Sequence, residues 1–117
     1  MSVCAWINPD SVPGANAPIV GKNGNSFGQY GWSVYLNKAG GNTIEFYTNL
    51  DSYIAPNVAY KLGEWQHICF TWDGNEGTAG LTSYINGVEP SGTTYLGDDS
   101  ATVYDDSTYN INIGYDP

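Results

Sequence analysis

Apolar and polar residues alternate along much of this chain with a period of two, which is the pattern of β-strands in a sheet. The clearest example is the stretch GEWQHICFTWDG, residues 63–74. Two alternating sets occupy the opposite faces of this stretch: Gln66, Ile68, Phe70 and Trp72 on one, and Trp65, His67, Cys69 and Thr71 on the other. Because both faces carry bulky groups, the pattern predicts a strand that is buried inside a β-sandwich.

The same alternation predicts further strands, which are separated by segments rich in Gly, Pro, Asn and Asp. No segment shows sustained helical periodicity. The expected strands span residues 2–8, 17–22, 31–37, 43–49, 64–73, 81–85, 88–96 and 108–114, and the one over 88–96 is interrupted by Pro90 and Gly92. Residues 51–63 form the longest irregular stretch, and we expect them to cross between two sheets.

The sharpest turn signal is the pair Asn86-Gly87, which is flanked by strand residues in the segment YINGV. This dipeptide favours a type I′ turn, because both central positions of that turn need a positive φ. Strands that recur at short intervals with such turns are typical of an all-β sandwich. The length of 117 residues suits one domain, residues 1–117.

Two segments resemble a known family. GEWQHICFTWDG (63–74) followed by LTSYINGV (81–88) is similar to the laminin-G-like and pentraxin-like branch of the concanavalin A-like sandwiches. In that branch a Trp-x-His strand leads into a strand that ends in Asn-Gly or Asp-Gly, and HICFTW matches the pentraxin His-x-Cys-x-Ser/Thr-Trp pattern. The resemblance covers about residues 2–114. It implies a jelly-roll β-sandwich of two antiparallel sheets that lacks the first and last strands of the family.

The resemblance also implies a disulfide between Cys4 and Cys69, because SVCAWINP (2–9) is similar to the early family strand whose cysteine pairs with the histidine strand. The alternation agrees with this pairing. If the apolar sets of the two strands face the core, both cysteines fall on the opposite face, where neighbouring antiparallel strands bring them within bonding distance.

Composition narrows the possible partners. Twelve acidic residues against three lysines and no arginine give a net charge of −9, so the chain has little with which to neutralise phosphates. We therefore expect no binding to nucleic acid. No apolar run is long enough to span a bilayer, so we expect no membrane insertion either.

The chain lacks the residue patterns of common catalytic sites. A glycan-cleaving sandwich needs two carboxylates on one strand face, but the same-face neighbours of Glu45 are Tyr47 and Asn49. Two cysteines and one histidine do not make a zinc ligand set. We expect a protein that is not an enzyme, in which His67 is structural and either donates a hydrogen bond to a backbone carbonyl or packs beside Trp65.

The acidic segment 97–110 has two interpretations: a calcium site built from carboxylates and carbonyls, or a solvated loop that supplies solubility. Related domains often bind calcium at the rim of the sandwich, and NIGYDP (112–117) resembles a strand end that precedes pentraxin ligands. The candidate ligands of calcium, the one cofactor that the sequence suggests, are Asp98, Asp99, Asp105, Asp106 and Asp116.

Aromatic residues also have two interpretations, a platform on which sugars stack or ordinary packing inside the sandwich. Trp6, Trp65 and Trp72 lie on expected strands, and we expect them in the core. The residues near expected loops are better candidates for a ligand-binding platform: Phe27, Tyr30, Trp32 and Tyr53.

These patterns favour a non-catalytic recognition or adhesion module that binds carbohydrate or protein, with calcium as an assisting ion. The alternative is a structural component of a larger assembly, such as a virion fibre, appendage or decoration protein. The resemblance implies an extracellular or surface-exposed protein, although no signal-peptide pattern follows Met1. It also implies an open sheet edge that is completed by strands from a larger protein or another subunit.

Overall fold

The computed structural model contains nine β-strands in the part of the chain that it describes. The described residues are 1–14, 17–23, 31–36, 42–48, 52–55, 59–73, 80–91, 94–96 and 107–114. The strands are β1 Ser2–Ile7, β2 Ala17–Asn23, β3 Gly31–Leu36, β4 Ile44–Thr48, β5 Ser52–Ala55, β6 Gln66–Trp72, β7 Leu81–Ile85, β8 Thr94–Leu96 and β9 Ile111–Ile113. None of these residues belongs to a helix that could cross a membrane.

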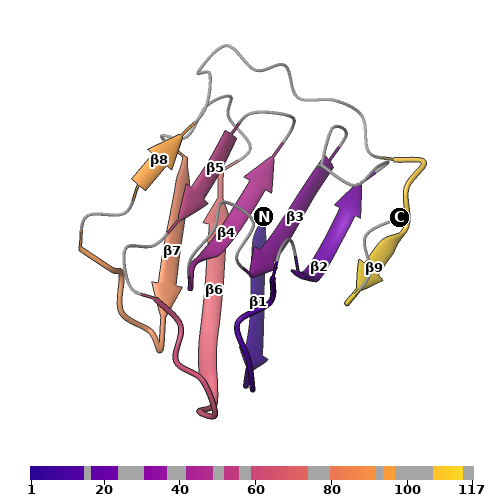
Figure 1. Cartoon of the computed structure of the whole chain (residues 1–117). Helices are drawn as coiled ribbons and strands as arrows, with labels where there is room; N and C mark the ends of the chain where they lie inside the picture. Colours follow the sequence, from indigo (N-terminus) through magenta and orange to yellow (C-terminus); the bar gives the residue numbers. More distant parts are fainter. Residues whose placement is uncertain are drawn as a thin grey trace.

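The strands form two antiparallel sheets that lie face to face (Figure 1). One sheet has three strands in the order β1-β6-β7, and the other has six in the order β8-β5-β4-β3-β2-β9. Each paired register is antiparallel. The architecture confirms the expected all-β sandwich of two antiparallel sheets.

The hydrophobic core lies between the two sheets. Phe46 on β4 stacks on Phe70 on β6, with ring centroids 5.5 Å apart and planes 15° from parallel, so this pair joins the layers directly. The alternation of β6 accounts for its side of the core, because its even-numbered residues point inward and its odd-numbered residues do not. The buried cluster consists of Ile7, Val34, Ile44, Phe46, Tyr60, Ile68, Phe70 and Leu81.

Two expectations about the strands were wrong. Residues 52–55, within the stretch expected to be irregular, form β5, which pairs with β4 inside the six-stranded sheet. The alternation over these four residues is too short to stand out in the sequence. The strand expected over 88–96 is reduced to residues 94–96, because Pro90 lacks the N–H that a strand ladder needs.

The turn at Asn86-Gly87 has the backbone that the sequence predicts. Asn86 has φ of +52° and Gly87 has φ of +79°, as both central residues of a type I′ turn require. Ile85 and Val88 exchange two backbone hydrogen bonds of 2.9 and 3.0 Å across the turn. The hairpin ends there, because the next described strand, β8, belongs to the other sheet.

Candidate functional site

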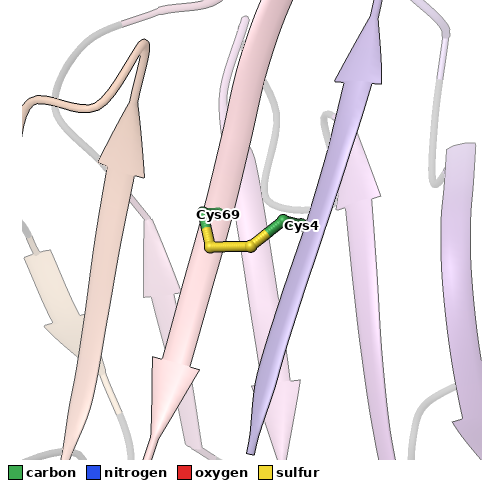
Figure 2. Close-up of a disulfide and its surroundings, with 2 residues drawn as sticks. All are labelled: Cys4 and Cys69. Carbon is green, nitrogen blue, oxygen red and sulfur yellow. A yellow bond between two sulfur atoms is a disulfide. The ribbon is translucent and has the colours of Figure 1, made fainter.

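Cys4 and Cys69 form a disulfide that joins β1 to β6 (Figure 2). The two residues lie directly opposite each other in the register, with Cα atoms 4.1 Å apart and an S–S bond of 2.00 Å. The bond lies on the side of the sheet that points away from the core, since Ala5 and Ile68, the next pair along, pack against the core. The expected pairing is therefore confirmed.

That side of the three-stranded sheet, which we call the outer face, carries three rows of side chains across the strands. The register places Cys4, Cys69 and Tyr84 in one row, and Ser2 begins a second row of hydroxyl groups. None of the residues that the register assigns to this face is Asp, Glu, Lys or Arg. They are Ser2, Cys4, Trp6, His67, Cys69, Thr71, Thr82 and Tyr84.

The third row begins with Trp6, whose side chain is largely in solvent. Trp6 is 64% exposed, and Trp65, which directly precedes β6, is 67% exposed. The expectation that both residues lie in the core was wrong, because the even-numbered residues of β1 and the odd-numbered residues next to and on β6 point outward. Trp72 does pack against the core, as expected. The outer face therefore presents the exposed indole ring of Trp6, and a second exposed indole, that of Trp65, lies directly before β6.

His67 lies beside Trp6 and supports it from the neighbouring strand. The two ring centroids are 5.3 Å apart, with planes tilted by 54°. The backbone N–H of His67 donates to Asn86 Oδ1 at 2.9 Å, and the N–H of Asn86 donates to the His67 carbonyl at 2.7 Å. The aromatic neighbour of the His67 ring is thus Trp6, where Trp65 was expected.

A small cavity of about 250 Å³ opens next to this row, beneath the turn after β7. Asn86 belongs to both the row and the cavity wall. The buried Gln66 side chain, which also lines the cavity, is held in place because its amide accepts from Lys61 N at 2.8 Å and donates to Lys61 O at 2.7 Å. The lining residues are Ala59, Lys61, Gln66, Ile85, Asn86, Val88 and Pro90.

The aromatic platform expected near the loops is not assembled by the described residues. Trp32 is partly buried, packs against the hydrophobic core and lies 6.4 Å from Phe46, nearly parallel to it. Its position on β3 turns it inward, since its neighbour Ser33 faces the other side. Phe27 and Tyr30 lie outside the described residues, and for Tyr53 only the backbone position in β5 is described.

The expected calcium ligands also fall outside the described residues. They are Asp98, Asp99, Asp105, Asp106 and Asp116. In the part of the chain that is described, no group of three or more His, Cys, Asp or Glu side chains is placed to hold a metal ion. The structure therefore neither assembles nor excludes the calcium site.

Glu45 is the only acidic residue within the nine described strands, and it is fully buried. It lies on the face of the six-stranded sheet that points away from the core, opposite Tyr35. Thr43 Oγ1 donates to one carboxylate oxygen at 2.6 Å, and the Tyr47 hydroxyl donates to the other at 3.0 Å. Glu45 is therefore held by neutral donors, with no second carboxylate on a described strand beside it.

Comparison with known proteins places the whole chain in one group. A laminin G family model, described as the concanavalin A-like lectin/glucanases superfamily, matches residues 1–117. No curated protein matches the chain significantly. The architecture of two antiparallel sheets agrees with this family match.

Proposed function

The chain belongs to the concanavalin A-like lectin/glucanase superfamily, and from this premise we propose that it is a non-catalytic recognition module whose outer face binds carbohydrate. The family supports a carbohydrate- or protein-binding module in general terms. The outer face supports the choice of carbohydrate, and its exposed tryptophans are the observation that carries the proposal.

The chemistry of the outer face suits a neutral sugar. The side chains of Trp6 and Trp65 are large, apolar and exposed to water. Burial of a large apolar side chain contributes roughly 1.5–3 kcal/mol of favourable free energy, which these two residues do not gain in the free protein. Indole rings stack on flat partners, and the hydroxyl groups of Thr71, Thr82 and Tyr84 on the same face offer hydrogen bonds. Because its rows contain no Asp, Glu, Lys or Arg, the face matches an uncharged ligand better than an anionic one.

The surroundings of Glu45 support a non-catalytic role. Hydrolysis of a glycosidic bond needs a pair of carboxylates about 5–10 Å apart, one of which acts as acid and the other as base or nucleophile. Glu45 is fully buried, and the hydroxyl groups of Thr43 and Tyr47 donate to its two oxygens. A reducing-sugar assay on any glycan that binds tests this part, and release of sugar would contradict it.

Glycan-array binding with the purified chain tests the proposal. We expect binding to neutral glycans, and we expect Trp6→Ala to weaken it about tenfold or more, because aromatic anchors carry most of the energy of such interfaces. Leu62→Ala is the matched control, since Leu62 is also exposed but lies in the turn before β6. If no glycan on the array binds, or if Trp6→Ala binds as tightly as the parent protein, the outer face is not the binding site.

Calcium assistance is a separate part of the proposal, and the sequence alone supports it. Carboxylate oxygens are the ligands that calcium prefers, and five candidate aspartates lie in 98–116. The array is therefore run with calcium and with a chelator, alongside calorimetry with calcium. An isotherm that Asp105→Asn and Asp106→Asn weaken would support the site. Absence of heat at millimolar calcium would leave the solvated-loop interpretation.

The disulfide supports an extracellular or surface-exposed location, because such bonds persist in oxidising compartments. The net charge of −9 supports carbohydrate or protein over nucleic acid as the partner. A structural role in a larger assembly is the second candidate function.

A further inference from the structure

The cavity beneath the turn after β7 adjoins the outer face but differs from it in chemistry. Figure 1 shows that this turn and the segment before β6 lie at the same end of the sandwich. Most of the cavity wall is apolar and consists of Ala59, Ile85, Val88 and Pro90. None of the described residues in the wall is Asp or Glu, so no carboxylate there repels an oxygen atom that enters.

The size of the cavity suits one substituent of a ligand. Its volume is about 250 Å³, whereas sites that enclose a whole drug-sized ligand measure roughly 300–1,000 Å³. The body of a larger ligand therefore stays outside. The apolar wall offers few partners for sugar hydroxyl groups, and a hydroxyl that is buried without a partner is unfavourable. The substituent that fits best thus carries an apolar group such as a methyl.

Asn86 supplies a polar group at this apolar wall. Its Oδ1 accepts from the backbone N–H of His67 at 2.9 Å, which identifies the two amide atoms, because only the oxygen accepts. The Nδ2 group carries two N–H donors, and no described residue accepts from either of them. Asn86 is exposed, so a ligand that enters the cavity can reach this group. The matching ligand group is a carbonyl oxygen.

The other polar side chains of the wall are already engaged. Gln66 Nε2 donates to the carbonyls of Lys61 at 2.7 Å and of Glu64 at 3.3 Å, which uses both of its N–H groups. The Lys61 ammonium forms an ion pair with Glu64 at 3.4 Å, in water. Asn86 is therefore the neutral side chain of the wall that still has N–H groups to donate to a ligand.

The backbone holds Asn86 in place before any ligand binds. The N–H of Asn86 donates to the His67 carbonyl at 2.7 Å, and Ile85 and Val88 exchange hydrogen bonds of 2.9 and 3.0 Å across the turn. The side chain is fixed as well, through its Oδ1. A group that is already ordered loses little conformational freedom on binding, so more of its interaction energy contributes to affinity.

The cavity lies at the end of the row that begins with Trp6. Trp6 pairs with His67 on β6, and His67 is hydrogen-bonded to Asn86, which directly follows β7. The backbones of Trp6 and Asn86 are thus two strand spacings, or about 10 Å, apart. One sugar ring that stacks on Trp6 does not reach Asn86, but the next ring of an oligosaccharide does.

We propose that the cavity binds the acetamido group of a sugar, and that the ligand of the outer face is an oligosaccharide that contains N-acetylated hexosamine. The carbonyl oxygen of the acetamido group accepts from Asn86 Nδ2, and its methyl group packs against Ile85 and Val88. The inference rests on the proposed function, because the ring that stacks on Trp6 brings the neighbouring acetamido group to the cavity. A hexose has a hydroxyl at that place, which buries no methyl group.

A comparison of matched glycans tests the proposal. We expect glycans with N-acetylated hexosamine to bind about tenfold or more tightly than glycans of the same linkage with unmodified hexose. Asn86→Asp should abolish this preference, because aspartate keeps an acceptor for the His67 N–H and suits the same turn but has no N–H to donate. Asn110→Asp is the matched control, since the same charge is added at an exposed residue before β9 and the preference should remain.

A second variant fills the cavity without changing its donor. Ala59→Leu places a larger side chain in the wall, and we expect it to reduce the preference about tenfold as well, because the methyl group loses its space. Leu62→Ala is the control for this change, since Leu62 lies in the same segment and outside the cavity wall.

NMR observes Asn86 directly and does not need tight binding. The probes are methyl N-acetyl-β-glucosaminide and methyl β-glucoside, which differ only in that the first carries an acetamido group and the second a hydroxyl. We expect the first to shift the side-chain amide resonances of Asn86 at millimolar concentration and the second to leave them in place.

The outcomes separate this inference from the proposed function. If both classes of glycan bind equally and Trp6→Ala weakens both, the outer face is a glycan site and the inference is wrong. If the preference exists but persists in Asn86→Asp and Ala59→Leu, the acetamido group binds elsewhere and the inference is again wrong. If no glycan binds and methyl N-acetyl-β-glucosaminide leaves Asn86 unshifted, both proposals are wrong.

Discussion

At the scale of single residues, the face of a strand on which a side chain lies decides its environment more than its chemical type does. Trp6 and Trp32 are both tryptophans on strands, Trp6 near the end of β1 and Trp32 near the start of β3. Trp32 packs on Phe46 in the core, while Trp6 is 64% exposed beside His67. Because successive residues of a strand point to opposite faces, a shift by one position moves an indole from the core to solvent.

Tyr60 shows the cost of placing a polar atom in the core. The residue is 2% exposed, and its hydroxyl finds no hydrogen-bond partner within the described part of the chain. We expect Tyr60→Phe to raise the free energy of unfolding by about 1 kcal/mol, because an unpaired buried hydroxyl is desolvated without compensation. Urea denaturation measures this, with Tyr84→Phe on the outer face as a control that should change little.

Alkaline pH gives a second signature of the same residue. Burial raises the pKa of the Tyr60 phenol above its usual value of 10.0. Since the unfolded chain releases this proton first, the contribution of Tyr60 to stability is complete below pH 10 and is lost as pH rises toward the folded-state pKa. Stability should therefore fall less steeply above about pH 10 in Tyr60→Phe than in the parent protein. If the free energies of unfolding of Tyr60→Phe and of the parent protein fall equally steeply with rising pH, the phenol is not buried.

At the scale of elements, β6 organises the small sheet because it has a neighbour on each side. It bonds to β1 and to β7, contributes Ile68 and Phe70 to the core, and carries Cys69 on the outer face. The disulfide therefore ties β1 to the strand with the most partners in that sheet. This arrangement keeps β1 in place although its other edge is open.

The contribution of the disulfide to stability follows from the length of chain that it closes. Cys4 and Cys69 are 65 residues apart, for which the chain-entropy model gives about 4 kcal/mol. We expect the double change Cys4→Ala and Cys69→Ala to lower the free energy of unfolding by about this amount in urea. Chemical reduction of the parent protein should give the same result. A loss below about 1 kcal/mol would show that the unfolded chain is not restrained by the bond.

At the scale of the whole molecule, the two layers differ in width. The six-stranded sheet extends past the three-stranded sheet at β2 and β9, which leaves Ile111 and Ile113 exposed beside the edge of β1. The outer face and the open edge both belong to the narrow sheet. The proposed glycan site therefore lies on the narrower of the two layers.

The charge of the molecule predicts how its stability responds to salt. Twelve acidic residues against three lysines repel one another in the compact state, and salt screens this repulsion. We expect Tm to rise by a few degrees when sodium chloride increases from about 10 mM to about 200 mM, as measured by differential scanning calorimetry. Magnesium chloride at matched ionic strength separates screening from ion binding. A Tm that falls with salt would show that attractive pairs outweigh the repulsion.

The sequence by itself determined the features that depend on neighbours along the chain. The period of two placed most strands within one or two residues, and Asn86-Gly87 predicted the turn after β7, because both signals are local. The fold class and the pairing of Cys4 with Cys69 followed from the resemblance and the alternation together, and both are confirmed.

Only the tertiary structure decided which strands lie side by side and which faces are covered. The alternation shows that Trp6 and Cys4 share a face, but not whether a second layer covers that face. The same limit hid β5, whose four residues are recognisable only through pairing with β4, and the open edge of β1 beside Ile111 and Ile113. Burial depends on contacts between residues far apart in the chain, and a local pattern does not contain them.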